Sequence, residues 1–108
     1  MKRGDLITVA ISGDYGKPRP ALVIQSDWLD QTDSVLICLL TATLRDVPLY
    51  RLLIQAGTGT GLRVPSQVMI DKIMAVRRDK CGAPIGRLDQ TTILELNRIL
   101  ALVVGVAD

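Results

Sequence analysis

The sequence contains no histidine and no phenylalanine, and these two absences limit both its chemistry and its core. Without an imidazole, any reaction near neutral pH proceeds without the side chain that usually titrates there. Because one Trp and two Tyr are the only aromatic residues, the core must consist of Leu, Ile, Val and Ala. A chain of 108 residues is long enough for one such core, so we expect a single domain spanning residues 1–108.

Neither sign of charge dominates, because 13 basic and 11 acidic residues leave a net charge of only +2. This excess is too small to indicate nucleic-acid binding by itself. Residues 72–87 nevertheless hold five basic side chains and only one acidic one, Asp79. The basic residues are Lys72, Arg77, Arg78, Lys80 and Arg87. This segment is either a surface that follows a phosphate backbone or an ordinary solvated strand and loop.

Cysteine and long apolar runs are scarce as well. Cys38 and Cys81 lie far apart in a chain without histidine, which predicts neither a zinc site nor a disulfide framework. We therefore expect no metal, no cofactor and a reduced, cytoplasmic location. The longest apolar stretch, residues 99–107, is much shorter than the ~20 residues of a membrane-spanning helix, and no secretory signal is visible, so no membrane partner is expected.

Alternating apolar residues and turn signals predict a series of short strands. These strands cover residues 6–11, 20–25, 34–43, 49–55, 66–70 and 73–78, and residues 83–86 are compatible with a further one. Asp71 and Lys72 are interpreted as a turn between the last two, although an ordinary hairpin explains the polar residues there equally well. The third strand is apolar on both faces, so it needs a cover from a helix or a second subunit.

Three glycines in residues 57–61 suggest a phosphate-binding loop at first sight, but their context favours a hairpin connection. A phosphate-binding loop leads into a helix, whereas Leu62 to Pro65 lead here into another strand. The only strong helix pattern begins after Asp89, which is a good N-cap, and Gly105 is a natural stop. Its inward positions are Ile93, Leu96, Leu100 and Val103. The fold class is therefore mainly β, a small, partly open, SH3-like barrel closed by a C-terminal helix.

Arg19 is the strongest candidate for chemistry, because it stands between Pro18 and Pro20 at the start of an apolar strand. Each proline fixes its own φ and drives the preceding residue toward extended geometry. A guanidinium held this firmly suits forked contact with a phosphate or carboxylate. The alternative is a surface arginine that happens to lie between prolines.

Other polar residues have two interpretations each. Thr41 and Thr43, at the end of the third strand, are either ordinary strand residues or hydroxyl donors to a phosphate in one cleft with Arg19. Gln67 is suited to reading a base edge, or it belongs to an ordinary hairpin. Trp28, in a polar segment, either stacks on a base or, as we favour, anchors its loop to the core.

Several segments, taken in order, give the chain a clear family resemblance. They are Lys2 to Ile7, Lys17 to Ile24, Leu39 to Thr41, Leu62 to Ile73, and the helix introduced by Ile85 to Asp89. In this order they resemble the MazF/PemK/Kid family of toxin endoribonucleases. The resemblance spans nearly the whole chain.

The resemblance implies a barrel of the CcdB/PemK type that acts as a homodimer and as an mRNA interferase. Such a toxin cuts single-stranded RNA at short sequences without metal, leaves 2′,3′-cyclic phosphate and 5′-hydroxyl ends, and is inhibited by a cognate antitoxin. Arg19 and Thr41 match the family's catalytic residues. The residues expected to contact RNA are Lys17, Tyr15, Thr43, Gln67, Asp71, Lys72 and Arg77. The glutamate often found in the family's first loop has no counterpart, and Asp14 is the nearest acid.

Two alternatives belong to other classes of protein. A non-catalytic inhibitor of DNA gyrase, similar to CcdB, would act through its C-terminal residues, but this chain ends in Val106, Ala107 and Asp108 without an aromatic tail. A barrel that binds RNA without cleaving it would leave the RNA at its original length.

Overall fold

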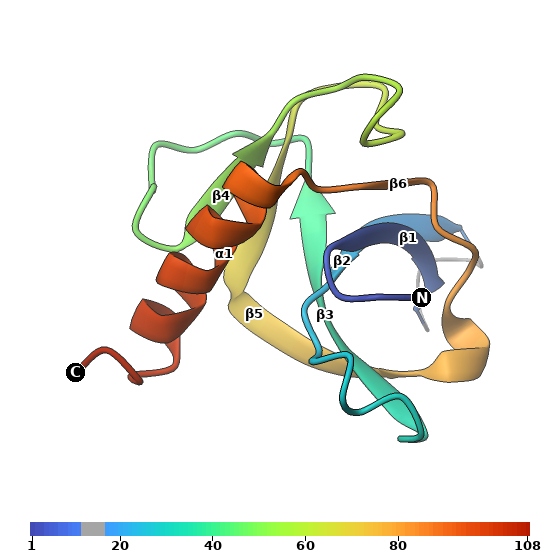
Figure 1. Cartoon of the computed structure of the whole chain (residues 1–108). Coiled ribbons are helices and arrows are strands. Elements are labelled where there is room, and N and C mark those ends of the chain that lie inside the picture. Colours follow the sequence, from blue (N-terminus) through green and yellow to red (C-terminus); the bar gives the residue numbers. More distant parts are fainter. Residues whose placement is uncertain (12–16) are drawn as a thin grey trace.

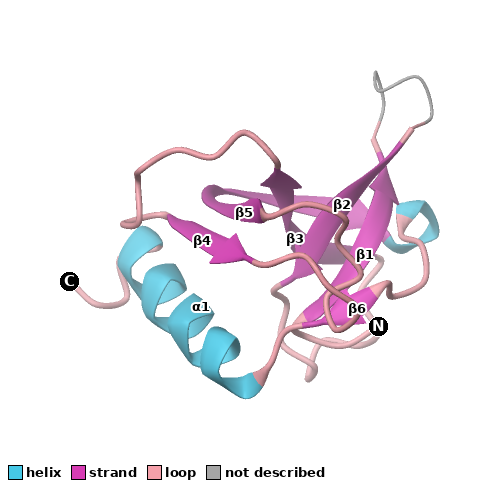
Figure 2. Cartoon of the chain, turned by 90° about the horizontal axis from the view of Figure 1, so that it is seen from above, coloured by secondary structure: helices cyan, strands magenta, loops and turns pink. Residues whose placement is uncertain are grey.

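A computed structural model describes residues 1–11 and 17–108 and shows one antiparallel sheet with a C-terminal helix. The strands are β1 (Asp5–Ala10), β2 (Pro18–Val23), β3 (Ser34–Thr41), β4 (Arg51–Ile54), β5 (Ser66–Arg77) and β6 (Gly86–Arg87), with a 3-10 turn η1 (Arg78–Lys80) and the helix α1 (Gln90–Val103). Their order across the sheet is β4-β5-β3-β2-β1-β6. The sheet curls into a partly open barrel, and α1 lies outside it beside β4 and β5 (Figures 1 and 2). The predicted fold class is confirmed.

Strand β3 is covered on both faces over most of its length, although Leu36 near its start is 40% exposed, and the chain itself supplies both covers. Cys38 and Leu40 belong to a core that includes Leu96 and Ile99 of α1. On the other face, Val35 and Ile37 pack with residues of β1, β2 and β5 inside the curl of the sheet. The helix is thus one of the two covers that the apolar pattern required, and the curled sheet is the other.

Strand β5 corrects the prediction of two strands joined by a turn at Asp71 and Lys72. The strand is continuous, but its register against β3 slips, because Cys38 pairs with Ile73 whereas Leu40 pairs with Val68. Such an irregularity lets a strand bend without ending, and Figure 1 shows β5 bending sharply along its length. Asp71 and Lys72 fall within this slip.

The helix agrees with its predicted signals. The carboxylate of Asp89 accepts a hydrogen bond from the Thr92 amide at 2.8 Å, which caps the N-terminus. The four predicted inward residues pack into the core, together with Ile99, which the predicted pattern omitted. Gly105, just beyond the helix, has a φ of +83°, a left-handed conformation that favours glycine.

The connection between β4 and β5 is the predicted hairpin loop, and it packs closely against the segment before α1. A Cβ on Gly61 would lie 2.2 Å from the carbonyl oxygen of Ile85, so only glycine fits there. Of the predicted strand at residues 83–86, Gly86 alone belongs to β6, which continues to Arg87 and pairs with β1, while Cys81 forms a separate bridge to Val9 of β1. Pro84 lacks an amide hydrogen, which explains the break in the ladder.

No helix in the described parts of the chain is long and apolar enough to span a membrane.

Candidate active site

Arg19 and Thr41 occupy neighbouring strands at one end of the sheet. The pairing of β2 with β3 runs from Val23 opposite Ile37 to Ala21 opposite Leu39, so it ends two residues short of both Arg19 and Thr41. Both residues therefore lie at the same end of two neighbouring strands. A cleft shared by the two side chains stays a prediction.

A row of residues continues across the sheet from this point. Thr41 pairs with Gln67 of β5, and Gln67 pairs in turn with Leu53 of β4. Arg19 is partly buried, while Leu53 is 47% exposed. This end of the sheet therefore carries a cation on β2, a hydroxyl on β3, an amide on β5 and an exposed apolar side chain on β4. We call Arg19, Thr41 and Gln67 the active row.

The hydroxyl of Thr41 is oriented by the backbone that follows it. Its Oγ1 accepts a hydrogen bond from the Thr43 amide at 3.1 Å. A hydroxyl has one donor hydrogen and two lone pairs, so this bond occupies a lone pair and leaves the hydrogen available. Thr41 is thus able to donate to an oxygen of a phosphate bound over the active row.

The side-chain amide of Gln67 is engaged with the chain between β3 and β4. Its Oε1 accepts hydrogen bonds from the Arg45 amide and from Nη1 of Arg51, both at 3.0 Å. Its Nε2 donates to the Arg45 carbonyl at 2.8 Å. One hydrogen on Nε2 has no partner among these bonds, so the expected contact with RNA stays a prediction.

Arg51, which the sequence patterns did not single out, completes this arrangement. The residue is only 9% exposed, and its Nη1 donates to the Thr43 carbonyl at 3.0 Å as well as to Gln67. Its Nε is buried without a hydrogen-bond partner among the described residues. The available signal was a single charge within the otherwise apolar stretch 51–54.

The remaining predicted RNA contacts are spread over the molecule. Lys17 is exposed just before β2, Thr43 is exposed after β3, and Tyr15 lies outside the described residues. Arg77 pairs with Ser34, at the other end of β3 from Thr41, and these two β3 residues are roughly 23 Å apart along the strand. Arg77 is therefore not part of the active row.

Asp71 and Lys72 form an ion pair at 3.1 Å in the irregular part of β5. Burial, together with the negative charge of Asp71, raises the pKa of the Cys38 thiol to about 12. Burial also raises the pKa of Cys81. Both cysteines are free thiols, and neither is poised as a nucleophile at neutral pH.

The basic residues of 72–87 are divided among β5, η1 and β6, and most of them have partners within the chain. Arg77 pairs with Asp79, and Arg87 donates to the carboxylate of Asp5 at 2.7 Å. The Arg77–Asp79 pair is exposed and contributes little to stability, so a phosphate can compete for Arg77, whereas the Arg87–Asp5 pair is partly buried. Contact between this segment and RNA remains a prediction. Within residues 1–11 and 17–108, no group of three or more His, Cys, Asp or Glu side chains is arranged to hold a metal ion.

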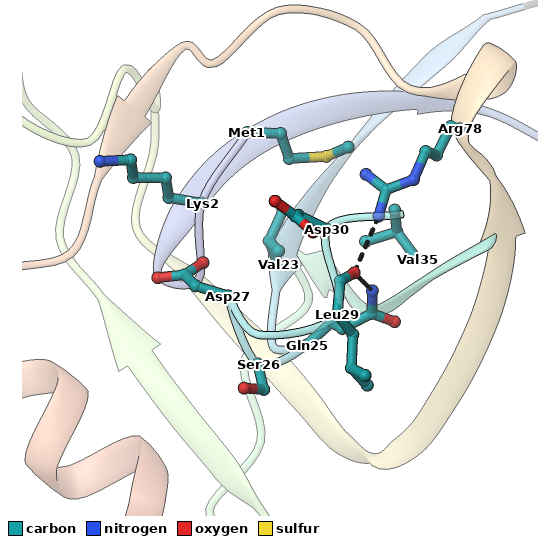
Figure 3. A pocket seen from close by; sticks show the side chains of 10 residues that line it. All are labelled: Met1, Lys2, Val23, Gln25, Ser26, Asp27, Leu29, Asp30, Val35 and Arg78. Atoms are coloured by element: carbon teal, nitrogen blue, oxygen red, sulfur yellow. Dashed lines mark hydrogen bonds between the residues drawn. The ribbon is translucent and has the colours of Figure 1, made fainter. Parts of the chain in front are cut away.

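The opposite end of β3 carries a pocket of about 330 Å³ beside the loop of residues 26–33 (Figure 3). Arg78 Nη2 and Gln25 Nε2 both donate to the Leu29 carbonyl, at 3.0 and 2.7 Å. Trp28, in this loop, is 94% exposed, so its prediction as an anchor to the core is wrong. These hydrogen bonds hold the loop instead.

Comparison with known proteins gives a match over nearly the whole chain. Residues 2–104 match the family described as PemK-like, MazF-like toxin of type II toxin-antitoxin system. The chain is also 42% identical over 108 residues to a probable endoribonuclease MazF from Mycolicibacterium smegmatis, covering 99% of each protein.

Solved structures have the same fold. An endoribonuclease in complex with its cognate antitoxin, from a mycobacterial species, superposes with a TM-score of 0.80 and 22% identity over 98% of this chain and 96% of that one. Mycobacterium tuberculosis toxin MazF-mt6 gives 0.79 at 20% identity, covering 94% and 96%. A MazE–MazF structure from Deinococcus radiodurans gives 0.77 at 20% identity, covering 97% and 95%.

Proposed function

The chain belongs to the PemK-like, MazF-like toxins of type II toxin–antitoxin systems, and we propose that it is a sequence-selective endoribonuclease acting on single-stranded mRNA. The relative that is 42% identical carries the name of such an enzyme. The proposed reaction needs no metal and no cofactor, and it leaves 2′,3′-cyclic phosphate and 5′-hydroxyl ends. Arg19 and Thr41 are the proposed catalytic residues.

The observation that supports this proposal is that a proline-held arginine and a threonine lie at the same end of two neighbouring strands, each two residues beyond the last recorded pair. We infer that one phosphate bound at this end is within reach of both side chains. The guanidinium supplies positive charge, and the oriented Thr41 hydroxyl supplies a donor hydrogen. This is a phosphate site rather than a site for a general base.

The chemistry follows from what RNA brings to such a site. The 2′-oxygen attacks the adjacent phosphorus in line, the new O2′–P bond forms, and the bond from phosphorus to the 5′-oxygen breaks. Negative charge grows on the non-bridging oxygens in the transition state, where preorganised donors act most strongly. Since the nucleophile belongs to the substrate, the protein needs to supply only orientation and positive charge.

Arg19 stabilises charge in this scheme and does not remove a proton, because a guanidinium stays protonated in proteins. Thr41 donates to one non-bridging oxygen and so helps to fix the phosphate for in-line attack. The sequence contains no histidine to shuttle the protons. The 2′-hydroxyl proton passes to a water molecule, and the departing 5′-oxygen takes a proton from water, so the step forms the 5′-hydroxyl without a net proton from the protein.

We further propose that the toxin is a cytoplasmic homodimer restrained by a cognate antitoxin. One structural neighbour is an endoribonuclease in complex with its cognate antitoxin, which supports the same kind of partner here. A flexible acidic tail suits the surface around Arg19 and the basic residues of 72–87, because it carries the charge that RNA carries. Sedimentation of the toxin alone and with its antitoxin tests both assemblies.

The central experiment incubates purified protein with a long single-stranded RNA in excess chelator and maps the fragment ends. We expect discrete cuts at a short recurring sequence, with cyclic phosphate termini. Arg19→Ala should leave the RNA intact, whereas Arg98→Ala, an exposed arginine of α1 paired with Glu95, is the matched control and should cut like the parent.

Intact RNA with the parent protein would overturn the proposal. It would direct attention to a gyrase-type target or to RNA binding without cleavage. Cuts that appear only when a divalent metal is added would refute the metal-free reaction while leaving the nuclease assignment in place.

A further inference from the structure

We propose that Gln67 and Arg51 are positioning residues that orient the Thr41 hydroxyl through the backbone of residues 43–45. This inference rests on the proposed function, because it assigns these two residues to the same phosphate site. In this role Gln67 acts through Thr41, in place of the direct RNA contact that the sequence predicts for it. We call the two side chains, with the hydrogen bonds they make to residues 43–45, the row clamp.

The first step is the geometry of the Gln67 amide. Its oxygen accepts from the Arg45 N–H, and its nitrogen donates to the Arg45 carbonyl, at 3.0 and 2.8 Å. Both backbone polar groups of one residue are therefore satisfied by one side chain, much as a neighbouring strand would satisfy them. Because donor and acceptor are matched, the amide has only one orientation that makes both bonds.

The second step is the bridge made by Arg51. Its Nη1 contacts the Thr43 carbonyl and Gln67 Oε1, both at 3.0 Å, so one nitrogen ties the start of the loop to the side chain that holds Arg45. The residue is only 9% exposed. Removing a guanidinium from water costs hydration free energy, which is offset only where the group makes well-directed hydrogen bonds. A lysine keeps the charge but lacks the planar fork that fixes these directions.

The third step connects the clamp to the reacting group. The Thr43 amide donates to Thr41 Oγ1 at 3.1 Å, which directs the remaining hydroxyl hydrogen away from Thr43. Thr41 also lies directly opposite Gln67 in the ladder. Fixing residues 43–45 therefore fixes the direction in which Thr41 donates, although neither clamp residue needs to contact the phosphate itself.

The molecule contains a matched control for this device. At the other end of β3, the Gln25 amide donates to the Leu29 carbonyl and to Thr32 Oγ1, at 2.7 and 3.0 Å, and its oxygen accepts from the Leu36 amide at 3.2 Å. Gln25 is buried, at 9% exposed, whereas Gln67 is half-buried, so losing the Gln25 side chain should disturb folding at least as much as losing that of Gln67. Its hydrogen bonds all lie toward the Ser34 end of β3, away from the residues that follow Thr41.

The test is a double-mutant cycle in single-turnover cleavage, because only coupled residues give non-additive effects. Gln67→Ala should slow cleavage by about 10–100-fold in the parent, the cost of a misplaced reacting group. In a Thr41→Ala background, where no hydroxyl remains to be oriented, the same change should cost less than about 3-fold. Arg51→Lys is the second, milder variant and should show the same coupling.

Affinity separates positioning from direct recognition. Binding of an RNA with a 2′-deoxy nucleotide at the cut site should be the same for Gln67→Ala and the parent. Gln25→Ala should change neither cleavage nor binding by more than about 3-fold. An equal loss of rate in both Thr41 backgrounds would overturn the proposal, and so would a loss of affinity as large as the loss of rate.

Amide hydrogen exchange tests the row clamp independently of whether the protein cleaves RNA. If the parent cleaves no RNA, the nuclease assignment fails, but the clamp is still tested by the Arg45 amide. That amide should exchange at least about 10-fold faster in Gln67→Ala, whereas in Gln25→Ala the Leu36 amide should respond instead. Unchanged exchange at Arg45 would overturn the clamp in either case.

Discussion

The two ends of β3 use the same device to hold a loop, but they offer very different surfaces to a substrate. At the Thr41 end, Gln67 and Arg51 bind the backbone of residues 43–45. At the Ser34 end, Gln25 and Arg78 bind the backbone carbonyls of Leu29 and Thr32. A glutamine with an arginine is thus a general way for this barrel to order a loop, and it does not by itself mark an active site.

The charge around each loop makes the difference. The Thr41 end has Arg19 in the neighbouring strand, and the loop that leads from β3 to β4 contains one acidic residue, Asp46, next to Arg45. The loop at the Ser34 end contains Asp27, Asp30 and Asp33. RNA carries a negative charge at every phosphate, so we expect it to bind at the first end, and on this account the RNA contact predicted for Arg77, at the Ser34 end, is not made.

The largest expected effect is the loss of Arg19. Arg19→Ala should reduce the cleavage rate constant by about 10²–10³-fold, because it removes the charge that stabilises the transition state. Arg78→Ala removes an arginine from the other end and should leave the rate within about 3-fold of the parent. Single-turnover cleavage measures both, and an equal loss in the two variants would abolish the distinction between the ends.

Removal of the Thr41 hydroxyl should have the next largest effect. Thr41→Val should slow cleavage by about 10–100-fold, since hydrogen bonds to charged groups contribute about 1.5–3 kcal/mol, and Thr41→Ser should restore most of the rate. Thr32→Val is the matched change at the Ser34 end, where the hydroxyl donates to the Ser34 carbonyl. If Thr32→Val slowed cleavage as much as Thr41→Val, the hydroxyl effect would be structural rather than catalytic.

The middle of β3 should differ from both ends by being closed to solvent. The pKa of Cys38 is raised from 9.0 to about 12, so the folded protein keeps the thiol protonated after the unfolded chain has lost the proton. The free energy of unfolding should therefore fall as the pH rises from about 9 toward 12, with this thiol contributing at most about 1.4 kcal/mol per pH unit.

Cys38→Ala should flatten this part of the stability profile, measured by denaturant unfolding at a series of alkaline pH values. Cys81→Ala should flatten it less, because Cys81 is less buried. Parallel profiles for the parent and Cys38→Ala would show that the middle of β3 is open to solvent.

The smallest effect should come from Trp28. Because the side chain is 94% exposed, Trp28→Ala should change the free energy of unfolding by less than about 0.5 kcal/mol. As the single tryptophan, it also reports on the Ser34 end by fluorescence. Its emission should not shift when uncleavable RNA binds, and a blue shift on binding would place RNA at the end where we do not expect it.

Short sequence patterns predicted those features of the fold that depend on residues close together in the chain. Asp89 caps the helix because a carboxylate satisfies exposed amides wherever a helix begins. Arg19 and Thr41 were found from their places at the ends of apolar strands, and the pairing of β2 with β3 places them at the same end of two neighbouring strands. Their roles in catalysis remain predictions.

Features that depend on distant parts of the chain were not predictable in the same way. The continuity of β5 through Asp71 and Lys72 depends on its partner β3, which holds both halves of the strand. Trp28 is exposed because Gln25 and Arg78 already hold its loop, and Arg78 is far away in sequence. Arg51 could not be singled out from the sequence, because only the fold brings its hydrogen-bond partners Gln67 and Thr43 within reach.

The central claim is that RNA supplies its own nucleophile and that the Arg19 end supplies charge and orientation. The most direct measurement replaces the ribose at a mapped cut site with a 2′-deoxy nucleotide and incubates this substrate with the parent protein in excess chelator. The account predicts that this position stays intact while unmodified copies of the same sequence elsewhere in the strand are cut. Cleavage at the 2′-deoxy position would show that another nucleophile attacks the phosphorus and would contradict the account.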